Sequence, residues 1–186
     1  MTAATTGVRQ LAGDYTLDVA HTTLGFVARH AMVTKVRGSF GDFDGTVHID
    51  GDDQTKSTVH IVIQAASITT RNEQRDAHLK SNDFLAMEEF PTITFDSTRV
   101  ELTDDTTVRL TGDLTIRGTT KPVTFDLEYT GSATDPFGNF RVGFEGSLTI
   151  NRKDWGVNWN AALEAGGVLV SEKVTLEFDV SAIKQG

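Results

Sequence analysis

Strict alternation of apolar and polar residues runs along most of this chain, and it constrains the fold more than any other feature of the sequence. Successive side chains of a β-strand point to opposite faces, so a strand with one buried face alternates in this way. In the stretch KPVTFDLEYT, every second residue from Val123 to Tyr129 is apolar and the residues between them are polar. The same period predicts further strands at 15–19, 23–30, 36–49 (with a change of phase near Gly41), 57–65, 92–100, 108–116, 140–150 and 174–180.

The polar face of these segments indicates an antiparallel sheet with one solvated side, because parallel sheets are usually covered by helices on both faces. Nine segments joined mostly by short polar links predict an all-β fold, either a meander closed into a barrel or a sandwich. Closure into a barrel also removes exposed strand edges, which make open sheets prone to association.

The sequence does not decide whether the interior of such a barrel is filled or hollow. Eight strands enclose a space that is either filled by side chains or able to hold one small ligand. Gly112 and Gly146 occupy inward positions, which fits unfilled space. Glycines at a backbone bend or a bulge would produce the same pattern, so both interpretations stand.

Composition limits the domain count and the class of partner. The chain has 186 residues, no cysteine and a net charge of −9. This length suits one domain, which we expect at 13–183 after a flexible N-terminal segment at 1–12. An acidic balance with scattered basic residues argues against nucleic acid as a partner.

Two further expectations concern membranes and location. No apolar run approaches the roughly 20 residues needed to cross a bilayer, so we expect no integral membrane segment. The N-terminus lacks a charged stretch followed by an apolar one, which is the pattern of a secretion signal, so we expect a cytoplasmic protein.

A charged, helix-like insert interrupts the run of strands. The segment 72–80 is expected to form a short helix with Asn72 as its N-cap, followed by a second helical turn through Met87. Neither piece is long enough to be stable alone in water. Phe84 and Leu85 must therefore pack against something, and the open end of the barrel is the natural place. The insert is then either a plug for an ordinary core or a lid over a ligand.

A second candidate lid is the stretch WGVNWNAALEAGG at 155–167, which carries two tryptophans and a one-turn helical stretch.

Four stretches carry a family resemblance: DVAHTTLGFVARHAMVTKVRGSFGDFDGTV, HLKSNDFLAMEEFPTITF, LTGDLTIRGTTKPVTFDL and INRKDWGVNWNAALEAGGVLVSEKVTLEFDV. In this order they resemble the YceI-like family from about Gly13 to Ala182. The resemblance implies an extended, lipocalin-like antiparallel barrel whose apolar interior binds a long polyisoprenoid or a similar amphiphilic lipid, often within a homodimer. Many relatives are exported through a signal peptide, a pattern from which this sequence departs.

An apolar chain would bind in such an interior because burial stabilises by roughly 25 cal/mol per Å² of apolar surface removed from water. The expected wall residues are Phe26, Ile61, Ile63, Phe95, Leu114, Phe125, Leu127, Phe144, Leu148, Leu176 and Phe178. Phe84 and Leu85 are the expected lid contacts, and Trp155 is expected near one end. Ordinary core packing is the alternative for each residue.

The positions of the histidines in the sequence give little indication of catalysis or metal binding. His30 shares its parity with Leu24 and Phe26, so an unbroken strand would aim it inward, toward a ligand head group or a backbone carbonyl. His48 and His60 are expected to face solvent. No two histidines have the spacing of a metal site and no catalytic motif occurs, so we expect no metal and no cofactor apart from a bound lipid.

Three functions remain open. The leading hypothesis is non-enzymatic binding, transport or storage of a long apolar amphiphile such as a polyprenyl lipid or an isoprenoid quinone. The second is an enzyme that acts on an amphiphilic substrate through His30 or His78 and a nearby carboxylate. The third is a structural or stress-related protein whose barrel is a solid core.

Overall fold

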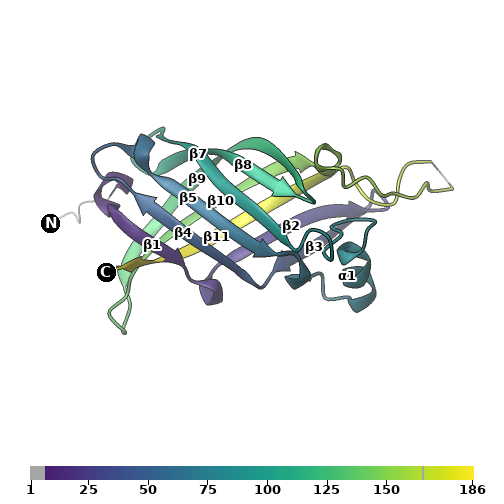
Figure 1. Ribbon diagram of the computed structural model, residues 1–186, viewed down its shortest axis with the longest axis horizontal. Helices are drawn as coiled ribbons and strands as arrows, with labels where there is room; N and C mark the ends of the chain where they lie inside the picture. The colour runs from purple at the N-terminus through teal and green to yellow at the C-terminus, as the bar shows by residue number, and fades with distance from the viewer. Residues whose placement is uncertain (1–6, 165) are drawn as a thin grey trace.

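The computed structural model describes residues 7–164 and 166–186, which form a long antiparallel barrel with a few short helices (Figure 1). The strands are β1 (Gly13–Leu17), β2 (Thr23–His30), β3 (Thr34–Phe40), β4 (Phe43–Ile49), β5 (Thr58–Gln64), β6 (Ile68–Thr69), β7 (Thr92–Leu102), β8 (Thr107–Ile116), β9 (Thr119–Thr134), β10 (Phe140–Asn151) and β11 (Lys173–Gln185). The helices are α1 (Glu73–Lys80) and the 3₁₀-helices η1 (Val8–Leu11), η2 (Val19–His21), η3 (Gln54–Lys56), η4 (Ala65–Ser67) and η5 (Arg152–Trp155). The all-β class predicted from the alternation is confirmed.

Eight strands close the barrel in the order β1-β4-β5-β7-β8-β9-β10-β11, and β11 pairs back to β1. Strand β11 also pairs with β2 along 175–179, and β3 and β6 extend the sheet beyond β2. The predicted strand 36–49 is therefore two strands, because the chain breaks at Gly41 and Asp42, where its phase changes. Strands β2 and β3 lie at the same end of the barrel as α1 (Figure 1).

The two inward glycines owe their position to close packing, so the interpretation as unfilled space is wrong for both. A Cβ at Gly112 would lie 2.4 Å from Cζ of Phe95 and 2.6 Å from the carbonyl oxygen of Asp96. Gly112 also pairs with β7 directly beside a bulge in that strand. A Cβ at Gly146 would lie 2.5 Å from the Asp126 carbonyl oxygen. Only glycine allows these approaches without a backbone shift.

The first part of the insert folds as predicted. Helix α1 is capped by Asn72, whose side-chain oxygen accepts a hydrogen bond of 3.0 Å from the backbone N–H of Arg75. The predicted second helical turn is wrong, because 81–87 forms hydrogen-bonded turns instead. The backbone of Ala86 has φ of 48°, a left-handed conformation that ends any helical path there.

The helical stretch predicted within 155–167 is also wrong, for the residues that the structure describes. Trp155 closes η5, and Ala162 then pairs with Val168 in an antiparallel bridge, so the segment 156–172 runs out from the barrel and back (Figure 1). Ala165 lies outside the described residues.

The opposite end of the barrel is closed by the start of the chain. Val8 and Leu11 of η1 are 3% and 1% exposed, so the described part of the segment expected to be flexible contributes two core residues, and residues 1–6 of that segment lie outside the described residues. Tyr15 lies beside them, and its hydroxyl donates a 2.7 Å hydrogen bond to the Leu11 carbonyl. Burial raises the pKa of Tyr15, with Tyr129 adding to the effect. This end of the barrel is therefore closed by packed side chains, and the buried Tyr15 hydroxyl has a hydrogen-bond partner.

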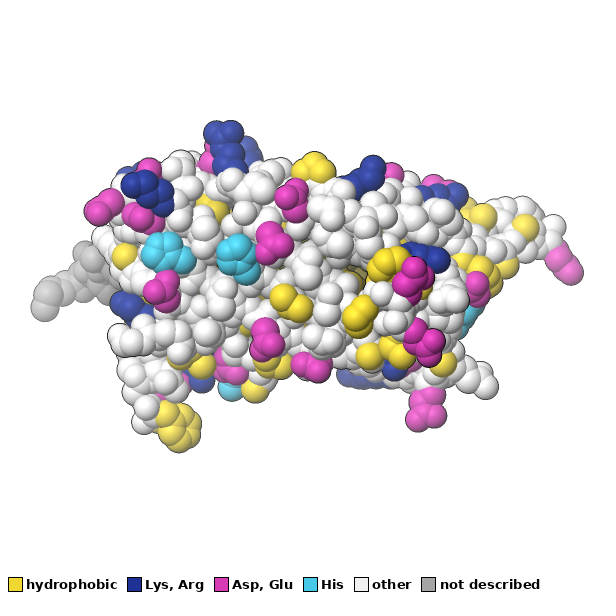
Figure 2. All heavy atoms as spheres, viewed as in Figure 1, with side chains coloured by type: hydrophobic (Ala, Val, Ile, Leu, Met, Phe, Trp, Pro, Cys, Tyr) yellow, Lys and Arg dark blue, Asp and Glu magenta, His cyan; other side chains and the backbone are white. Residues whose placement is uncertain are grey.

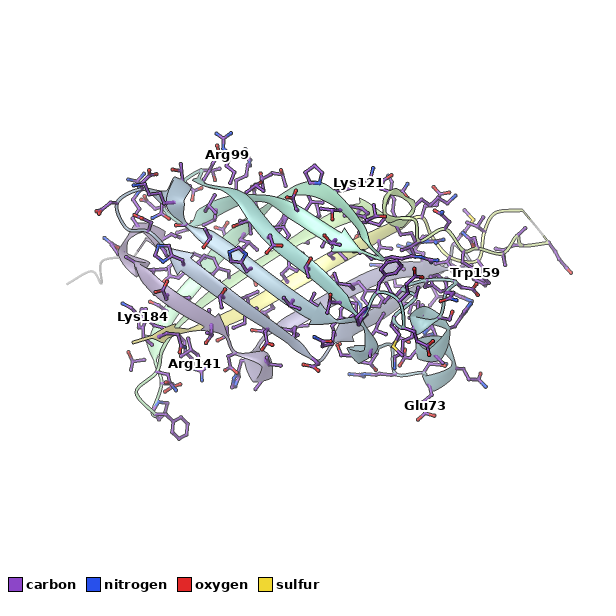
Figure 3. All side chains as sticks on the ribbon, in the orientation of Figure 1. Glu73, Arg99, Lys121, Arg141, Trp159 and Lys184 are labelled. Atoms are coloured by element: carbon purple, nitrogen blue, oxygen red, sulfur yellow. The ribbon has the colours of Figure 1, made fainter. Side chains whose placement is uncertain are left out.

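An arginine with two carboxylate partners ties the β9–β10 turn to the barrel. Nε of Arg141 lies 2.7 Å from Asp135, and its Nη1 pairs with Asp18, which precedes η2. Arg141 lies near Lys184 at the end of the barrel away from α1 (Figure 3). The hydrogen bond from Arg141 lowers the pKa of Asp18, and lowers the pKa of Asp135 to about 2.

We expect Arg141→Gln to flatten the acid limb of the stability curve. A carboxylate whose pKa is depressed on folding contributes stability above its unfolded pKa, near 4, and loses it as the pH falls toward its folded pKa. Melting temperatures measured between pH 5 and pH 2 should therefore fall less steeply for Arg141→Gln than for the wild type. Lys184→Gln removes the same charge at the same end and should keep the wild-type slope, and equal slopes for all three proteins would contradict the assignment.

Candidate functional site

An apolar cavity of about 290 Å³ occupies the inside of the barrel. Each of the eight barrel strands contributes inward side chains to its lining, and nearly all of them are apolar. The lining extends from Val8 at the end closed by η1 to Phe84 and Trp155 at the end near α1. Apolar cavities of about half this volume already bind small hydrocarbons, so this space is large enough for part of a ligand.

The inward aromatic residues show that the interior is hollow. Phe125, Phe144 and Phe178 point into the barrel, yet each is only partly buried. A side chain in a filled core is shielded on all sides, whereas these rings keep accessible surface where they face the cavity. The rings of Phe95 and Phe125 lie 5.7 Å apart and those of Phe125 and Phe178 lie 5.1 Å apart, which forms a continuous aromatic wall.

Fourteen of the fifteen residues that the sequence predicts as ligand contacts line this cavity. They are Phe26, Ile61, Ile63, Phe84, Leu85, Phe95, Leu114, Phe125, Leu127, Phe144, Leu148, Trp155, Leu176 and Phe178. Eleven of them lie on the inward face of their strands, as the alternation predicts, and Phe84, Leu85 and Trp155 lie on the two candidate lid segments. Contact with a ligand stays a prediction for all of them.

The inward position predicted for His30 is wrong. Its side chain is exposed, and it does not belong to the cavity lining. Strand β2 pairs with β11 only from Thr23 to Val27, and beyond that point it runs past the barrel with β3. Parity along a strand predicts the inward face only while the strand remains in the wall, and β2 leaves the wall before His30.

The two candidate lids pack on each other through Phe84, which is 5% exposed. Its ring lies 5.4 Å from Trp159 of the 156–172 segment and 5.0 Å from His78 of α1. Trp159 and Glu73 of α1 mark this end of the barrel in Figure 3. Nη1 of Arg117 donates a 2.7 Å hydrogen bond to the Phe84 carbonyl and ties the lid to the β8–β9 turn. One cluster therefore covers this end of the cavity.

Arg152, the first residue of η5, is a buried arginine in the cavity lining. Its Nε donates to the Ser171 carbonyl at 2.9 Å, its Nη1 donates to the Val157 carbonyl at 2.6 Å, and its Nη2 donates to the Val170 carbonyl at 3.3 Å. Burial lowers the pKa of Arg152, and the charge of Glu172 opposes this effect. Arg152 therefore holds both ends of the 156–172 segment against the barrel.

The remaining histidines show no arrangement for chemistry on a ligand. His48 and His60 are exposed as predicted, and they pair with Asp14 and Asp96 at 2.7 and 2.8 Å. Nε2 of His78 lies 2.7 Å from Asp83, but His78 packs against the lid aromatics and is absent from the cavity lining. Of these residues only His48 borders the cavity, and its imidazole is exposed and paired with Asp14, which is exposed and lies outside the lining. His60 and His78 and their partners Asp96 and Asp83 are absent from the lining.

Val8, Arg152 and Trp159 are among the residues at the cavity and its lid that the predicted set of ligand contacts omits. Val8 lies in a short 3₁₀-helix, which is too brief to show a period. Arg152 is a basic residue at the end of a strand, a pattern typical of a solvated position. Trp159 lies in an irregular segment, and only its aromatic character marked it as a packing residue.

Comparison with known proteins agrees with this architecture. A model of the YceI-like domain matches residues 15–182. UPF0312 proteins of Staphylococcus aureus strains N315 and Mu50 are 42% identical over 170 residues, which cover 91% of this chain and 95% of each relative. No helix among the residues described here is long and apolar enough to cross a membrane.

Solved structures share the fold. BcnA of Burkholderia cenocepacia has a TM-score of 0.77 at 21% identity, over 89% of this chain and 98% of BcnA. The YCEI protein of Campylobacter jejuni has a TM-score of 0.73 at 27% identity, over 85% and 90%. A polyisoprenoid binding domain from Saccharophagus degradans has a TM-score of 0.70 at 15% identity, over 92% and 98%. The closed eight-stranded barrel and the match over nearly its whole length show that the chain belongs to the YceI-like domain family.

Proposed function

We propose that this protein binds a long apolar amphiphile, most readily a polyisoprenoid, inside its barrel, and that it carries or stores the lipid without changing it chemically. The observation that carries the proposal is the apolar cavity, which is bordered by half-buried aromatic rings and runs from η1 to the lid. The likeness to a solved polyisoprenoid binding domain supports the same class of ligand.

The lining explains why such a ligand would be preferred. Each methylene that moves from water into the cavity gains about 0.8 kcal/mol, and a branched polyprenyl chain presents apolar surface along its whole length. A water-soluble metabolite would lose its hydrogen bonds in the same place, because the wall offers few polar partners. Selectivity then rests on the length and width of the tube rather than on directional bonds.

Purification followed by organic extraction tests this function. We expect mass spectrometry of the extract to show a long-chain isoprenoid or a similar lipid. We also expect native mass spectrometry to show saturable uptake of an added polyprenol by the delipidated protein. A protein that carries no lipid after purification and takes up no polyprenol would contradict the proposal.

A further inference from the structure

The turn between β2 and β3 presents apolar side chains to solvent at the lid end of the barrel. Met32 is 62% exposed and Val33 is 75% exposed, although most large apolar residues of this chain face inward. Apolar side chains also lie on the neighbouring 156–172 segment, which projects at the right-hand end of Figure 2. Adjacent exposed apolar residues at a protruding tip indicate a contact surface.

The backbone of this turn is strained in a way that favours a function for its side chains. Ala31 and Met32 both have left-handed backbones, with φ of 51° and 64°. Hairpin turns of this kind prefer Asn and Gly, which adopt such angles at little cost. Ala and Met there are each disfavoured by about 1–2 kcal/mol. Asn or Gly would give a more stable and more soluble turn, and the chain instead has an exposed methionine.

The charge of the hairpin is opposite to that of the whole protein. No Asp or Glu occurs between Asp18 and Asp42, whereas the chain as a whole has a net charge of −9. Arg29 and Lys35 flank the tip and are exposed, and the ion pairs of the described residues include neither of them. Nη1 of Arg29 donates at 3.2 Å to the carbonyl of Val33. The tip therefore consists of two exposed apolar residues, Met32 and Val33, flanked by two exposed cationic residues, Arg29 and Lys35.

Other charges near the tip are few. Arg37, further along β3, pairs with Glu177 of β11 at 3.3 Å. The neighbouring 156–172 segment adds exposed Glu164, and its Glu172 pairs with Lys153 at 2.8 Å. The nearby acidic residues therefore form no ion pair with Arg29 or Lys35, whose charges remain available to a partner.

The tip is joined directly to the segment that covers the cavity. The backbone N–H of Ala31 donates at 2.7 Å to the carbonyl of Leu169, and His30 forms a bridge with Val170. Val170 lines the cavity, and Met32 lies against Gly167 of the same excursion. A surface that engages the tip would therefore contact the outer side of the lid.

We propose that the Met32–Val33 tip docks on the surface of a lipid bilayer that contains anionic head groups. Met32 and Val33 enter the interface, and Arg29 and Lys35 lie at the level of the head groups, as in other peripheral proteins that combine apolar and cationic residues. Docking would place the lid end of the cavity against the source of an apolar ligand. Uptake of a ligand from the bilayer rests on the proposed function, whereas binding of the tip to the bilayer does not.

Flotation with vesicles tests the proposal. Full-length protein is mixed with vesicles of phosphatidylcholine alone or with about 30% phosphatidylglycerol, and the bound fraction is measured. We expect binding to the anionic vesicles that falls about tenfold in Met32→Asn/Val33→Ser and about tenfold in Arg29→Gln/Lys35→Gln. The matched control is Phe137→Ser, because Phe137 is 88% exposed in the β9–β10 turn at the opposite end of the barrel. This control should bind like the wild type.

The outcomes separate docking from the other possibilities. Asn tolerates the left-handed backbone, so Met32→Asn/Val33→Ser should melt no lower than the wild type. The proposal is overturned if the wild type does not float, if that variant floats equally well, or if Phe137→Ser loses binding. It is also overturned if the tip variant changes only the oligomeric state in gel filtration, which would make the tip a contact between copies of this chain. Uptake of polyprenol delivered from ethanol, without vesicles, reports on the cavity alone.

Discussion

Tryptophan in place of Leu148 is expected to weaken the binding of a long polyprenol by roughly a thousandfold. Leu148 lies on β10 opposite Leu176, two residues closer to η5 than Gly146, which pairs with Phe178. Its side chain lines the cavity between the aromatic wall and the lid. An indole ring there narrows the tube and excludes the part of the ligand beyond it. Exclusion of about five methylenes at about 0.8 kcal/mol each removes about 4 kcal/mol, which is about three orders of magnitude in affinity.

Ser147→Trp is the matched control for this change. Ser147 is the preceding residue on the same strand, and it is exposed on the outer face. The same ring added outside the barrel leaves the tube unchanged, so polyprenol should bind Ser147→Trp as it binds the wild type. Isothermal titration or fluorescence displacement measures both variants, and melting curves show that both are folded.

A short alcohol such as decanol makes the result specific for length. A chain that fits on one side of the indole ring loses little contact, so Leu148→Trp should bind decanol within about tenfold of the wild type. Wild-type affinity for polyprenol in Leu148→Trp would show that the ligand does not pass this point. The barrel interior would then not be the binding site for polyprenol.

The strands were predictable because their signal is local. Each residue between Val123 and Tyr129 shows its face by its own polarity, and β9 places them accordingly. Because the wall of the cavity is the set of inward faces, the same pattern located eleven of its residues, and Phe84, Leu85 and Trp155 were predicted instead from the segments expected to cover its end. The cap of α1 at Asn72 was predictable for the same reason, since it involves only neighbouring residues.

The errors arise where a distant part of the chain decides the outcome. His30 has inward parity, but the wall ends before it because β11 pairs with only part of β2. Gly112 resembles an empty position in the sequence, and the ring of Phe95 from the next strand covers it. Arg152 is buried by carbonyls that follow it by as many as 19 residues. The hollow interior itself depends on the total side-chain volume of all eight strands, which no single segment reveals.

Arg152→Met is expected to lower the free energy of unfolding by about 3 kcal/mol. Methionine retains much of the side-chain volume and removes every donor. The carbonyls of Ser171 and Val157 then lose their partner, whereas that of Val170 keeps a 2.7 Å hydrogen bond from Asn160. An unsatisfied buried acceptor costs about 1–3 kcal/mol, so two of them account for the expected loss. Urea denaturation measures it, and Arg109→Met is the control because Arg109 is an exposed arginine whose partner Asp126 is exposed too.

The loss should be concentrated in the segment that Arg152 ties down. The backbone N–H of Leu169 donates to Ala161, and that of Ala31 donates to Leu169, so both amides depend on the position of 156–172. We expect hydrogen exchange at these amides to speed up in Arg152→Met more than exchange in β7 or β8. Arg152 also lies 5.9 Å from the centre of the Phe84 ring, so a looser segment frees one side of the lid. Bound polyprenol should then dissociate faster, and an unfolding free energy within 1 kcal/mol of the wild type, with unchanged exchange, would show that the carbonyls find water instead.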